Sequence, residues 1–431
     1  MKIEFHGAAA EVGRSCIEIF CDDGDRYLLD VGIKFKEDGF LFPDGVDDIG
    51  EVDGVFLSHA HLDHSGGLPL FEHKHLKGPI FCTKQTMAIT KILLKDSFKI
   101  ARIRNLHPAY SKTDLIQVKK DIKFVEFDKW YKHRNVRFMY LNAGHVPGSA
   151  MILLEIEGKR IFYTADFNTR KSELMFNAIP NHELQEKPID VLITESTYGN
   201  RELPDRKKLE KQFIKSIEKT LKKGGSVLIP VFGLGRAQET LLMLAKKQWP
   251  VKIYFDGMCK KVTKTILNTP SKYVDNKDVL AEMFFEKVEW VGSDKHRKDA
   301  LRKQGIYVTT SGMVQGGPVL KYLENLWHDE KSKIMLMGFQ CKRTNGRYLL
   351  DEKFVYLDGW KTYVKCEVEK YDFSGHVDRE GIKDMLKKIR HKKVFFQHGD
   401  EEAVDLMKEW AKKNLKSEAY APRIGDVFEI K

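Results

Sequence analysis

The sequence predicts an α/β protein in which a strand-rich part of the chain is interrupted by a segment of alternating strands and helices. Short apolar runs rich in β-branched and aromatic residues, joined by Gly and Asp turns, fill roughly the first 200 residues. From about residue 201, amphipathic helical stretches alternate with apolar strands, which is typical of a partly parallel sheet. The strand-rich texture resumes after about residue 359.

The opening third is expected to form short strands, the first of which are antiparallel neighbours. One helix is expected over residues 86–103. Its apolar side chains fall on one stripe at helical spacing: Ile89, Ile92, Leu93 and Ile100. The expected strands cover residues 3–10, 15–23, 26–32 and 54–59, and a further strand-rich stretch covers residues 137–167.

The middle of the chain is expected to form a sheet with crossover helices. One amphipathic helix over residues 205–225 stops at Gly224 and Gly225, and a second helix covers residues 235–248. The expected strands cover residues 226–233, 251–257, 304–312 and 333–340, and the chain closes with a strand at 394–400 and a helix at 401–414.

Composition excludes several classes of protein. The chain has 431 residues, of which 42% are hydrophobic and 31% charged, as in ordinary globular proteins. Collagenous, disulfide-scaffold and wholly disordered proteins are therefore excluded. Lys and Arg outnumber Asp and Glu by 73 to 62, a net charge of +11. This charge favours a polyanionic partner such as nucleic acid, although a lysine-rich solvated surface would give the same total.

The sequence also bears on location. No apolar run approaches the roughly 20 residues that span a bilayer, so no membrane partner is expected. The first residues lack the basic and apolar regions of a secretory signal. The six cysteines are scattered and form no CxxC pair. A reducing cytoplasm is the location that this cysteine usage favours.

The strongest chemical signal is the heptapeptide Ser-His-Ala-His-Leu-Asp-His at residues 58–64, which follows an apolar strand. In an extended segment His59 and His61 point the same way, so both can reach one metal ion. Asp63 and His64, past the bend, can reach a second ion close by. Imidazole and carboxylate groups suit Zn²⁺. The alternative is a solvated polar loop with chance histidines.

This segment resembles the H-x-H-x-D-H motif of the metallo-β-lactamase superfamily, whose fold is an αββα sandwich that holds one or two metal ions. Three further motifs resemble those of the superfamily in the same order along the chain. They place Asp30 at the end of an early strand, His145 in NAGHVPGSA and Asp166 in YTADF.

Later segments resemble the β-CASP nucleases, a branch of this superfamily. Glu195 ends a strand as the acid of motif A does, His376 lies in a segment similar to motif B, and His398 stands in a segment similar to motif C. The resemblance covers essentially the whole chain. It is nearest to the endonuclease subunit of the cleavage and polyadenylation specificity factor and its archaeal relatives, here without KH domains. One departure is Arg343, which stands where the family commonly has glycine.

The resemblance implies the domain plan. A metallo-β-lactamase αββα sandwich would occupy residues 1–200 and 361–431, and an inserted β-CASP α/β domain would occupy residues 201–360.

The resemblance also implies two zinc ions per chain. His59, His61 and His145 would hold one ion, Asp63, His64 and His398 the other, and Asp166 would bridge them. Asp30 would accept the second N–H of a ligand histidine and fix its tautomer. Asp63, Glu195 and His376 are the predicted catalytic residues, with His376 as general acid and Glu195 as its hydrogen-bond partner. Structural roles are the alternatives: a polar pair for Glu195 and His376, a core histidine at 398 and a turn aspartate at 30.

Candidate RNA contacts lie in two loops of the middle segment. Ser311, Gly312, Gly316 and Gly317 form a loop of small residues that lets backbone N–H groups approach phosphates. Arg236 opens a helix, where its side chain and the helix N-terminus would meet a phosphate. A tight turn and a packing arginine are the respective alternatives.

The function that these features predict is a zinc-dependent ribonuclease acting on single-stranded RNA, as an endonuclease, a 5′→3′ exonuclease or both. A small-molecule hydrolase of the same fold, such as a thioesterase or lactonase, is a second hypothesis. A non-catalytic scaffold subunit is a third, although all seven ligand positions are intact. The resemblance also suggests a homodimer.

Overall fold

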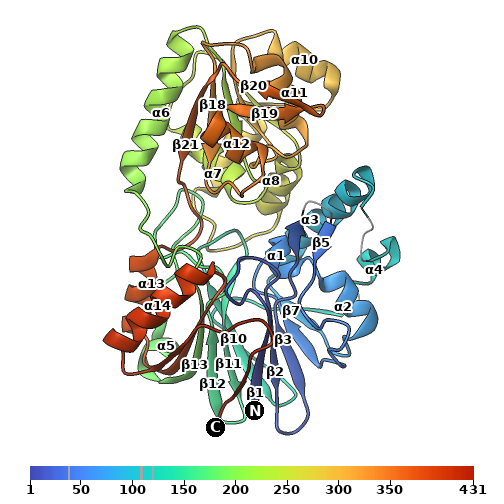
Figure 1. The fold of residues 1–431 in the computed structure, drawn as a ribbon, viewed down its shortest axis with the longest axis vertical. Helices are drawn as coiled ribbons and strands as arrows, with labels where there is room; N and C mark the ends of the chain where they lie inside the picture. Colours follow the sequence, from blue (N-terminus) through green and yellow to red (C-terminus); the bar gives the residue numbers. More distant parts are fainter. Residues whose placement is uncertain (37–38, 107–109, 119–120) are drawn as a thin grey trace. The chain divides into compact units, whose positions relative to one another are not determined.

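A computed structural model describes residues 1–36, 39–106, 110–118 and 121–431 (Figure 1). The chain divides into two compact units, and each is described by itself. The first unit comprises Met1–Lys171, Met175–Glu202 and His376–Lys431, and the second comprises Ser172–Leu174 and Leu203–Gly375. The domain limits at 200/201 and 360/361 stay predictions made from the sequence.

The first unit contains two seven-stranded sheets. In the first sheet β1, β2 and β3 are antiparallel neighbours, as the sequence predicted, and β6, β7 and β8 continue the sheet in parallel. Its strands, in spatial order, are β24 (Val427–Glu429), β1 (Lys2–Gly7), β2 (Cys16–Phe20), β3 (Arg26–Leu29), β6 (Gly54–Phe56), β7 (Ile80–Cys82) and β8 (Ile122–Phe124). A short ladder of β4 (Lys34–Lys36) and β5 (Gly39–Leu41) lies outside both sheets.

The second sheet of this unit changes from antiparallel to parallel along its width. The strands β9 to β12 are antiparallel, whereas β12, β13, β22 and β23 run parallel. Parallel neighbours bring their carboxyl ends to one edge of a sheet. In spatial order the strands are β23 (Glu418–Tyr420), β22 (His391–Gln397), β13 (Ile189–Glu195), β12 (Lys159–Tyr163), β11 (Ala150–Ile156), β10 (Val136–Asn142) and β9 (Trp130–His133).

The main core of the first unit lies between the two sheets. Alternate residues of β10, such as Phe138 and Tyr140, belong to this core, whereas Met139 and Leu141 belong to a second core on the other face of the same sheet. Because both faces are buried, the strand reads as a continuous apolar run in the sequence. The architecture is therefore the layered αββα sandwich that the sequence predicted.

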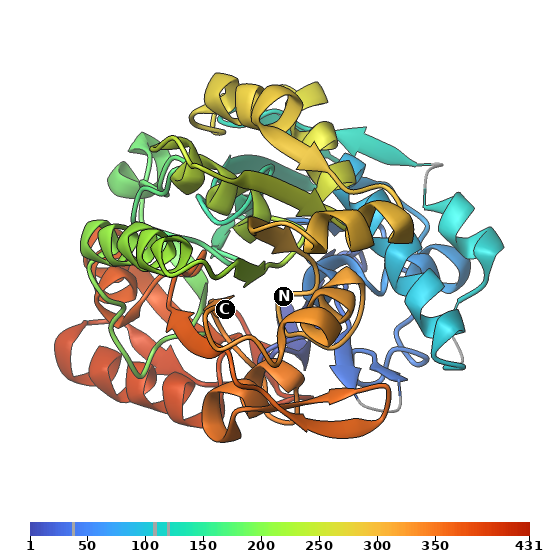
Figure 2. The same cartoon turned by 90° about the horizontal axis from the view of Figure 1, so that it is seen from above.

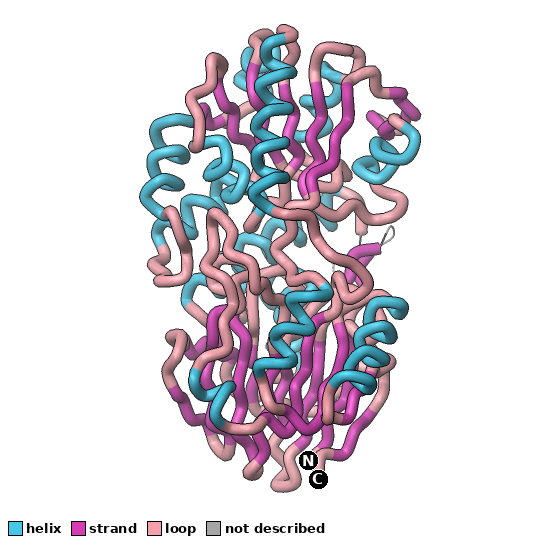
Figure 3. Tube along the Cα trace, turned by 90° about the vertical axis from the view of Figure 1, so that its left-hand side faces the viewer, coloured by secondary structure: helices cyan, strands magenta, loops and turns pink. Residues whose placement is uncertain are grey.

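Helices cover the outer faces of both sheets (Figures 1 and 3). Residues of α13 and α14 pack on the second sheet, and residues of α2 and α3 pack on the first. The helix expected over 86–103 begins earlier, at Lys84, because Thr83 accepts a hydrogen bond from the backbone N–H of Thr86 and caps it. The helices are α1 (Leu62–Ser65), α2 (Leu68–Lys74), α3 (Lys84–Ile103), α4 (Lys112–Gln117), α5 (His182–Glu186), α13 (Arg379–Lys388) and α14 (Glu401–Asn414).

The second unit contains a six-stranded sheet in which every pair of neighbours is parallel. This is the sheet that the alternation of strands and helices predicted. The spatial order is β16 (Val288–Trp290), β15 (Lys252–Asp256), β17 (Gly305–Thr309), β14 (Val227–Pro230), β18 (Lys333–Met337) and β21 (Glu367–Tyr371). The strand β21 pairs with β18 over its whole length, so residues 367–371 belong to this unit.

Helices lie on both faces of this parallel sheet (Figure 2). The helix expected over 205–225 runs from Arg206, which follows the capping residue Asp205, to Lys222. Next to α9 lies a π-helix over Met283–Lys287, and a hairpin of β19 (Phe354–Leu357) and β20 (Trp360–Tyr363) follows α12. The helices are α6 (Arg206–Lys222), α7 (Arg236–Ala245), α8 (Cys259–Asn268), α9 (Lys277–Glu282), α10 (Asp294–Leu301), α11 (Pro318–Leu326) and α12 (Asn345–Glu352).

Among the described residues, no helix is both long enough and apolar enough to cross a membrane.

The loop that follows β3 holds the short helix α1 by its backbone. Val31 donates to the carbonyl of His64 at 2.8 Å and Ile33 donates to that of Leu62 at 2.9 Å. Gly32 lies so close to the same helix that a Cβ on it would stand 1.7 Å from the carbonyl oxygen of Asp63. A side chain at position 32 would therefore displace the backbone that carries Asp63 and His64.

We predict that Gly32→Ala destabilises the fold by about 1–3 kcal/mol, because overpacking against a fixed backbone costs that much. Thermal unfolding measures the change. Gly292→Ala is the matched control, since a Cβ there meets no atom within 4 Å. Equal melting temperatures for Gly32→Ala and the control would contradict the close packing of this loop on α1.

Candidate metal centre

The predicted ligand residues stand at the ends of strands in the first unit. His59 and His61 follow β6, and Asp63 and His64 lie within α1, directly beyond the bend. Asp166 follows β12, and Glu195 ends β13. His398 follows β22, the parallel neighbour of β13, and His145 lies in the turn between β10 and β11. Residues distant in the sequence therefore converge at one edge of the sandwich.

The structure brings the seven predicted ligands into two adjoining groups that share Asp166. In each group the candidate ligand atoms all lie within 4.8 Å of one another. Asp166 Oδ2 lies 3.6 Å from His59 Nε2 and 3.3 Å from His64 Nε2, one histidine from each group. The first group is His59, His61, His145 and Asp166, and the second is Asp63, His64, Asp166 and His398.

Several atoms of these groups lack a hydrogen-bond partner although they are buried. Within the described residues, both carboxylate oxygens of Asp166 and Nε2 of His59, His64 and His398 are buried and unpaired. Burying unpaired polar atoms is costly, so such atoms in a native protein call for a water or an ion. Two carboxylate oxygens and three imidazole nitrogens that face one another are a donor set that fits metal ions.

Asp30 fixes the orientation of two of these histidines. Its Oδ2 accepts hydrogen bonds from His64 Nδ1 at 2.7 Å, from the Ser58 hydroxyl at 2.7 Å and from the Tyr163 hydroxyl at 2.8 Å. Its Oδ1 accepts the backbone N–H of Ser58 at 2.7 Å. The Asp30 carboxylate thus holds the proton of His64 on Nδ1 and leaves Nε2 as the ligand atom.

Ser58 extends the same effect to His59. Its hydroxyl gives its only proton to Asp30, so it acts as acceptor for His59 Nδ1, which lies 3.0 Å away. Nδ1 of His59 therefore carries the proton, and the unpaired Nε2 faces Asp166. Thr197 contacts His398: its hydroxyl donates to the His398 carbonyl at 3.0 Å and lies 3.2 Å from His398 Nδ1, and Asp166 Oδ1 lies 3.2 Å from the same nitrogen.

Sequence reasoning did not identify Ser58, Tyr163 and Thr197. Ser58 directly precedes the histidine motif, and Thr197 lies two positions after Glu195, so both adjoin residues that the motifs singled out. Hydroxyl residues are common beside strand ends, and nothing in their spacing shows which acceptor they reach. Tyr163 is fully buried at the end of β12, where it reads as an ordinary core residue.

The protonation of the groups follows from burial and from their neighbours. Burial lowers the pKa of His61 to about 4, so this imidazole is neutral and able to bind a metal ion. Burial also lowers the pKa of His59, aided by His64. Burial alone would raise the pKa of Asp166, but His398 and His64 hold it well below its usual range. Asp166 is therefore a carboxylate at neutral pH.

Glu195 and His376 form a pair beside this cluster. Glu195 is fully buried, and its Oε1 accepts the backbone N–H of Phe167 at 2.8 Å. Its Oε2 lies 3.0 Å from His376 Nδ1. Burial would lower the pKa of His376, but Glu195 and Asp166 outweigh it and raise that pKa to about 9. His376 is accordingly protonated at neutral pH, with Nδ1 directed at Glu195.

The candidate RNA contacts all belong to the second unit. The Ser311 hydroxyl is engaged within its own loop, where it donates to the Gly316 carbonyl at 3.1 Å and accepts from the Gln315 N–H at 3.2 Å. Gly312 and Gly317 belong to the same loop. Arg236 is only 8% exposed and begins α7, where with Arg206 it lowers the pKa of the buried Glu239.

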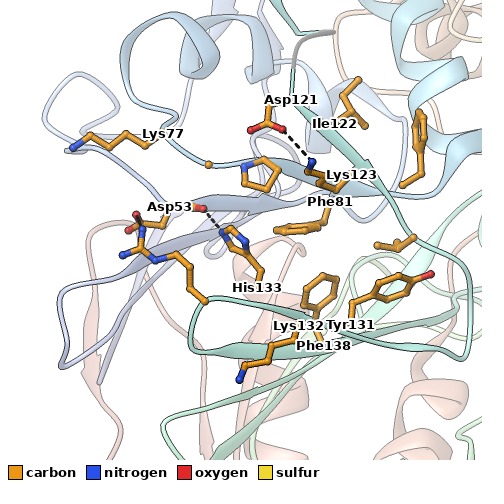
Figure 4. A pocket seen from close by; sticks show the side chains of 15 residues that line it. Asp53, Lys77, Phe81, Asp121, Ile122, Lys123, Tyr131, Lys132, His133 and Phe138 are labelled. Atoms are coloured by element: carbon orange, nitrogen blue, oxygen red, sulfur yellow. Dashed lines mark hydrogen bonds and ion pairs between the residues drawn. The ribbon is translucent and has the colours of Figure 1, made fainter.

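A pocket of about 620 Å³ lies elsewhere in the first unit, at the edge strands β8 and β9 (Figure 4). Phe81, Tyr131 and Phe138 line it together with Lys123 and Lys132. None of the predicted site residues lines this pocket. It contributes nothing to the metal centre.

Comparison with known families agrees with this geometry. Residues 11–210 match the metallo-beta-lactamase superfamily, and residues 237–349 match the Beta-Casp domain. Residues 363–422 match the Zn-dependent metallo-hydrolase RNA specificity domain. The "Probable RNase MJ4" of Methanocaldococcus jannaschii is 37% identical over the full length of both chains.

This chain belongs to the β-CASP branch of the metallo-β-lactamase superfamily.

Other relatives of this β-CASP protein span most of its length. "RNase aCSPSF2" of Saccharolobus solfataricus is 31% identical, covering 98% of this chain and 84% of the relative. "Cleavage and polyadenylation specificity factor 73" of Drosophila melanogaster is 32% identical, covering 95% of this chain and 61% of the relative. A crystal structure of a protein of unknown function from Enterococcus faecalis aligns with a TM-score of 0.60 over 99% of both chains. At 16% identity this last likeness concerns the fold alone.

The model that matches residues 363–422 describes a domain of Zn-dependent metallo-hydrolases, and the His and Asp clusters of this β-CASP protein are candidate metal ligands. The RNA specificity domain, residues 363–422, contains both His376 and His398. The two residues that complete the site thus come from a segment that begins more than 150 residues after Glu195 in the chain.

We predict that Tyr163→Phe weakens metal binding about tenfold, because the change removes one of the three donors that hold Asp30 Oδ2. Competition with a chromogenic chelator measures the affinity without reference to cleavage. Tyr140→Phe is the matched control, since Tyr140 is equally buried but donates to the Phe81 carbonyl. Equal loss in both variants would show that Tyr163 has no special role toward the metal centre.

Proposed function

We propose that this β-CASP protein is a zinc-dependent ribonuclease that hydrolyses phosphodiester bonds of single-stranded RNA, as an endonuclease and with 5′→3′ exonuclease action as a further mode. The observation that carries the proposal is the shared Asp166 between two groups of buried ligand atoms, with the Glu195–His376 pair beside them.

Two zinc ions per chain fit the two groups. His59, His61 and His145 would hold one ion, Asp63, His64 and His398 would hold the other, and Asp166 would contact both. Such ions would polarise the scissile phosphodiester and lower the pKa of an attacking water. Asp30, Ser58 and Thr197 contact Nδ1 of His64, His59 and His398 respectively and so orient these rings toward the two groups.

His376 is the proposed general acid. Hydrolysis breaks a P–O bond, and the departing oxygen needs a proton. His376 carries one at neutral pH because Glu195 and Asp166 raise its pKa to about 9. Glu195 accepts a hydrogen bond from Nδ1–H of His376 and so fixes the orientation of the ring. The proton on Nε2 is then the one that His376 delivers to the leaving oxygen. Glu195 is in turn held by the backbone N–H of Phe167.

RNA is the substrate that the relatives and the charge favour. Two of the relatives carry RNase in their names, and the RNA specificity domain spans residues 363–422. The net charge of +11 suits a polyanion. The basic charge and this domain speak against a thioesterase or lactonase, and the complete set of seven ligands speaks against a scaffold without catalysis. A homodimer and a cytoplasmic location stay predictions from the resemblance and the cysteines.

We predict that the purified protein holds close to two zinc ions per chain and that chelation abolishes the cleavage of single-stranded RNA. Elemental analysis and a gel assay on end-labelled RNA measure the two quantities. Bis(p-nitrophenyl) phosphate and a thioester serve as comparison substrates. Full cleavage by metal-free protein, or turnover of the thioester but not RNA, would refute the proposed function.

We further predict that His376→Asn lowers kcat by about 100-fold or more while zinc content and RNA affinity stay within about twofold, because the change removes a proton donor and no ligand. Single-turnover cleavage and elemental analysis separate the two effects. His391→Asn is the control, since His391 is a partly buried histidine at the start of β22, away from the ligand groups. Loss of zinc in His376→Asn would mean that His376 is a ligand instead.

A further inference from the structure

Open α/β sheets bind their ligands beyond the carboxyl ends of their strands, and the parallel sheet of the second unit is of this kind. After β14 the chain continues to β15 on one side, whereas after β17 it passes to β18 on the other side of β14. The carboxyl ends of β14, β17 and β18 therefore form a topological switch point, where open α/β sheets bind their ligands. The loops after these strands are residues 231–235, 310–317 and 338–344, called here the switch loops.

The switch loops carry positive charge and no acid. Their two charged residues are Lys342 and Arg343, and both are exposed. Lys342 is exposed and has no ion pair within the part of the chain that the structure describes. Two exposed cations in loops that contain no carboxylate suit a phosphate backbone.

Phe339 is the exposed aromatic side chain of this edge. Its side chain is 51% exposed, although the residues around it are tied down. The N–H of Gly338 donates to the Tyr371 carbonyl at 2.8 Å, and the Gln340 side chain donates to the Gly312 carbonyl at 3.2 Å. A large ring that a fixed loop holds exposed is available to stack on a base.

The rest of the loop is held equally firmly. The Thr344 hydroxyl donates to the Cys341 carbonyl at 2.7 Å, and the Gln315 side chain accepts the N–H of Asn345 at 3.0 Å. Arg343 has a φ of 62°, the left-handed region that favours glycine. A strained arginine beside an exposed ring points to a role for this loop in binding rather than in stability.

We infer that Phe339 is a stacking platform for a base of single-stranded RNA, with Lys342 contacting an adjacent phosphate. This inference rests on the proposed function and names one subsite of it. Every base has a π-face, so a single exposed ring binds RNA without reading its sequence. A charged, acid-free loop next to the ring supplies the backbone contact. A protein partner would prefer a broader apolar patch than one ring among cations.

The test compares the affinity of the intact chain for a phosphorothioate RNA, which resists cleavage, by fluorescence anisotropy. Phe339→Ala should bind about tenfold more weakly, and Phe339→Trp should bind as the unchanged chain does. Phe339→Ala should leave the slope of log affinity against log salt concentration unchanged. Lys342→Ala should reduce that slope by about 1, the value for one phosphate contact. Trp360→Ala is the control, because Trp360 is 79% exposed but lies in β20, outside the switch loops.

An RNA with abasic residues completes a double-mutant cycle, in which the ring is removed from the protein and the base from the RNA. The unchanged chain should lose about the same tenfold on abasic RNA, and Phe339→Ala should lose nothing further. Independent, additive losses would overturn the stacking. Unchanged affinity of Phe339→Ala would also overturn it, and would leave a protein contact as the role of this ring. If the unchanged chain cleaves RNA in either case, the proposed function stands; if it neither binds nor cleaves RNA, both proposals fall.

Discussion

The buried carboxylate of Asp30 is the interaction on which the candidate metal centre depends. It accepts four hydrogen bonds, three of them on one oxygen, from Ser58 beyond β6, His64 in α1 and Tyr163 at the end of β12. Asp30 itself has a φ of 61°, a conformation that is unfavourable for a residue with a side chain. This backbone strain occurs at a residue whose carboxylate orients His64 directly and His59 through Ser58, and strained residues are typical of functional sites.

The backbone around Asp30 also positions the candidate ligand residues. The loop after Asp30 binds the backbone of α1, so the carboxylate and the helix that carries Asp63 and His64 are fixed together. Gly32 permits this approach because any side chain would meet the Asp63 carbonyl. The second sheet then places Asp166, Glu195 and His398 by its run of parallel strands, whose carboxyl ends share one edge. A switch from antiparallel to parallel pairing within one sheet thus assembles the site.

Much of this arrangement could be predicted from the sequence, and the exceptions have physical reasons. The motif around His59 is so dense in ligand-type residues that the sequence alone predicts a metal site. The order of the later motifs indicated the other candidate ligands. The hydroxyls of Ser58, Tyr163 and Thr197 were not predicted, because a hydroxyl shows its role only through the acceptor it reaches. The strand β21 was also not placed: its pairing with β18 is a long-range contact that local texture does not encode. Arg343 could be singled out from the sequence, and its left-handed φ gives the reason that glycine suits this position.

Our proposal for the site is that Asp166 lies between two metal positions whose histidines are held by Asp30, Ser58 and Thr197. Anomalous diffraction from crystals of the zinc-loaded protein, recorded on both sides of the zinc edge, tests it most directly. We expect two peaks, each about 2.0–2.2 Å from an Asp166 oxygen, with Nε2 of His59 at one and Nε2 of His64 and His398 at the other. A single peak, or peaks bound through Nδ1 of these histidines, would contradict it.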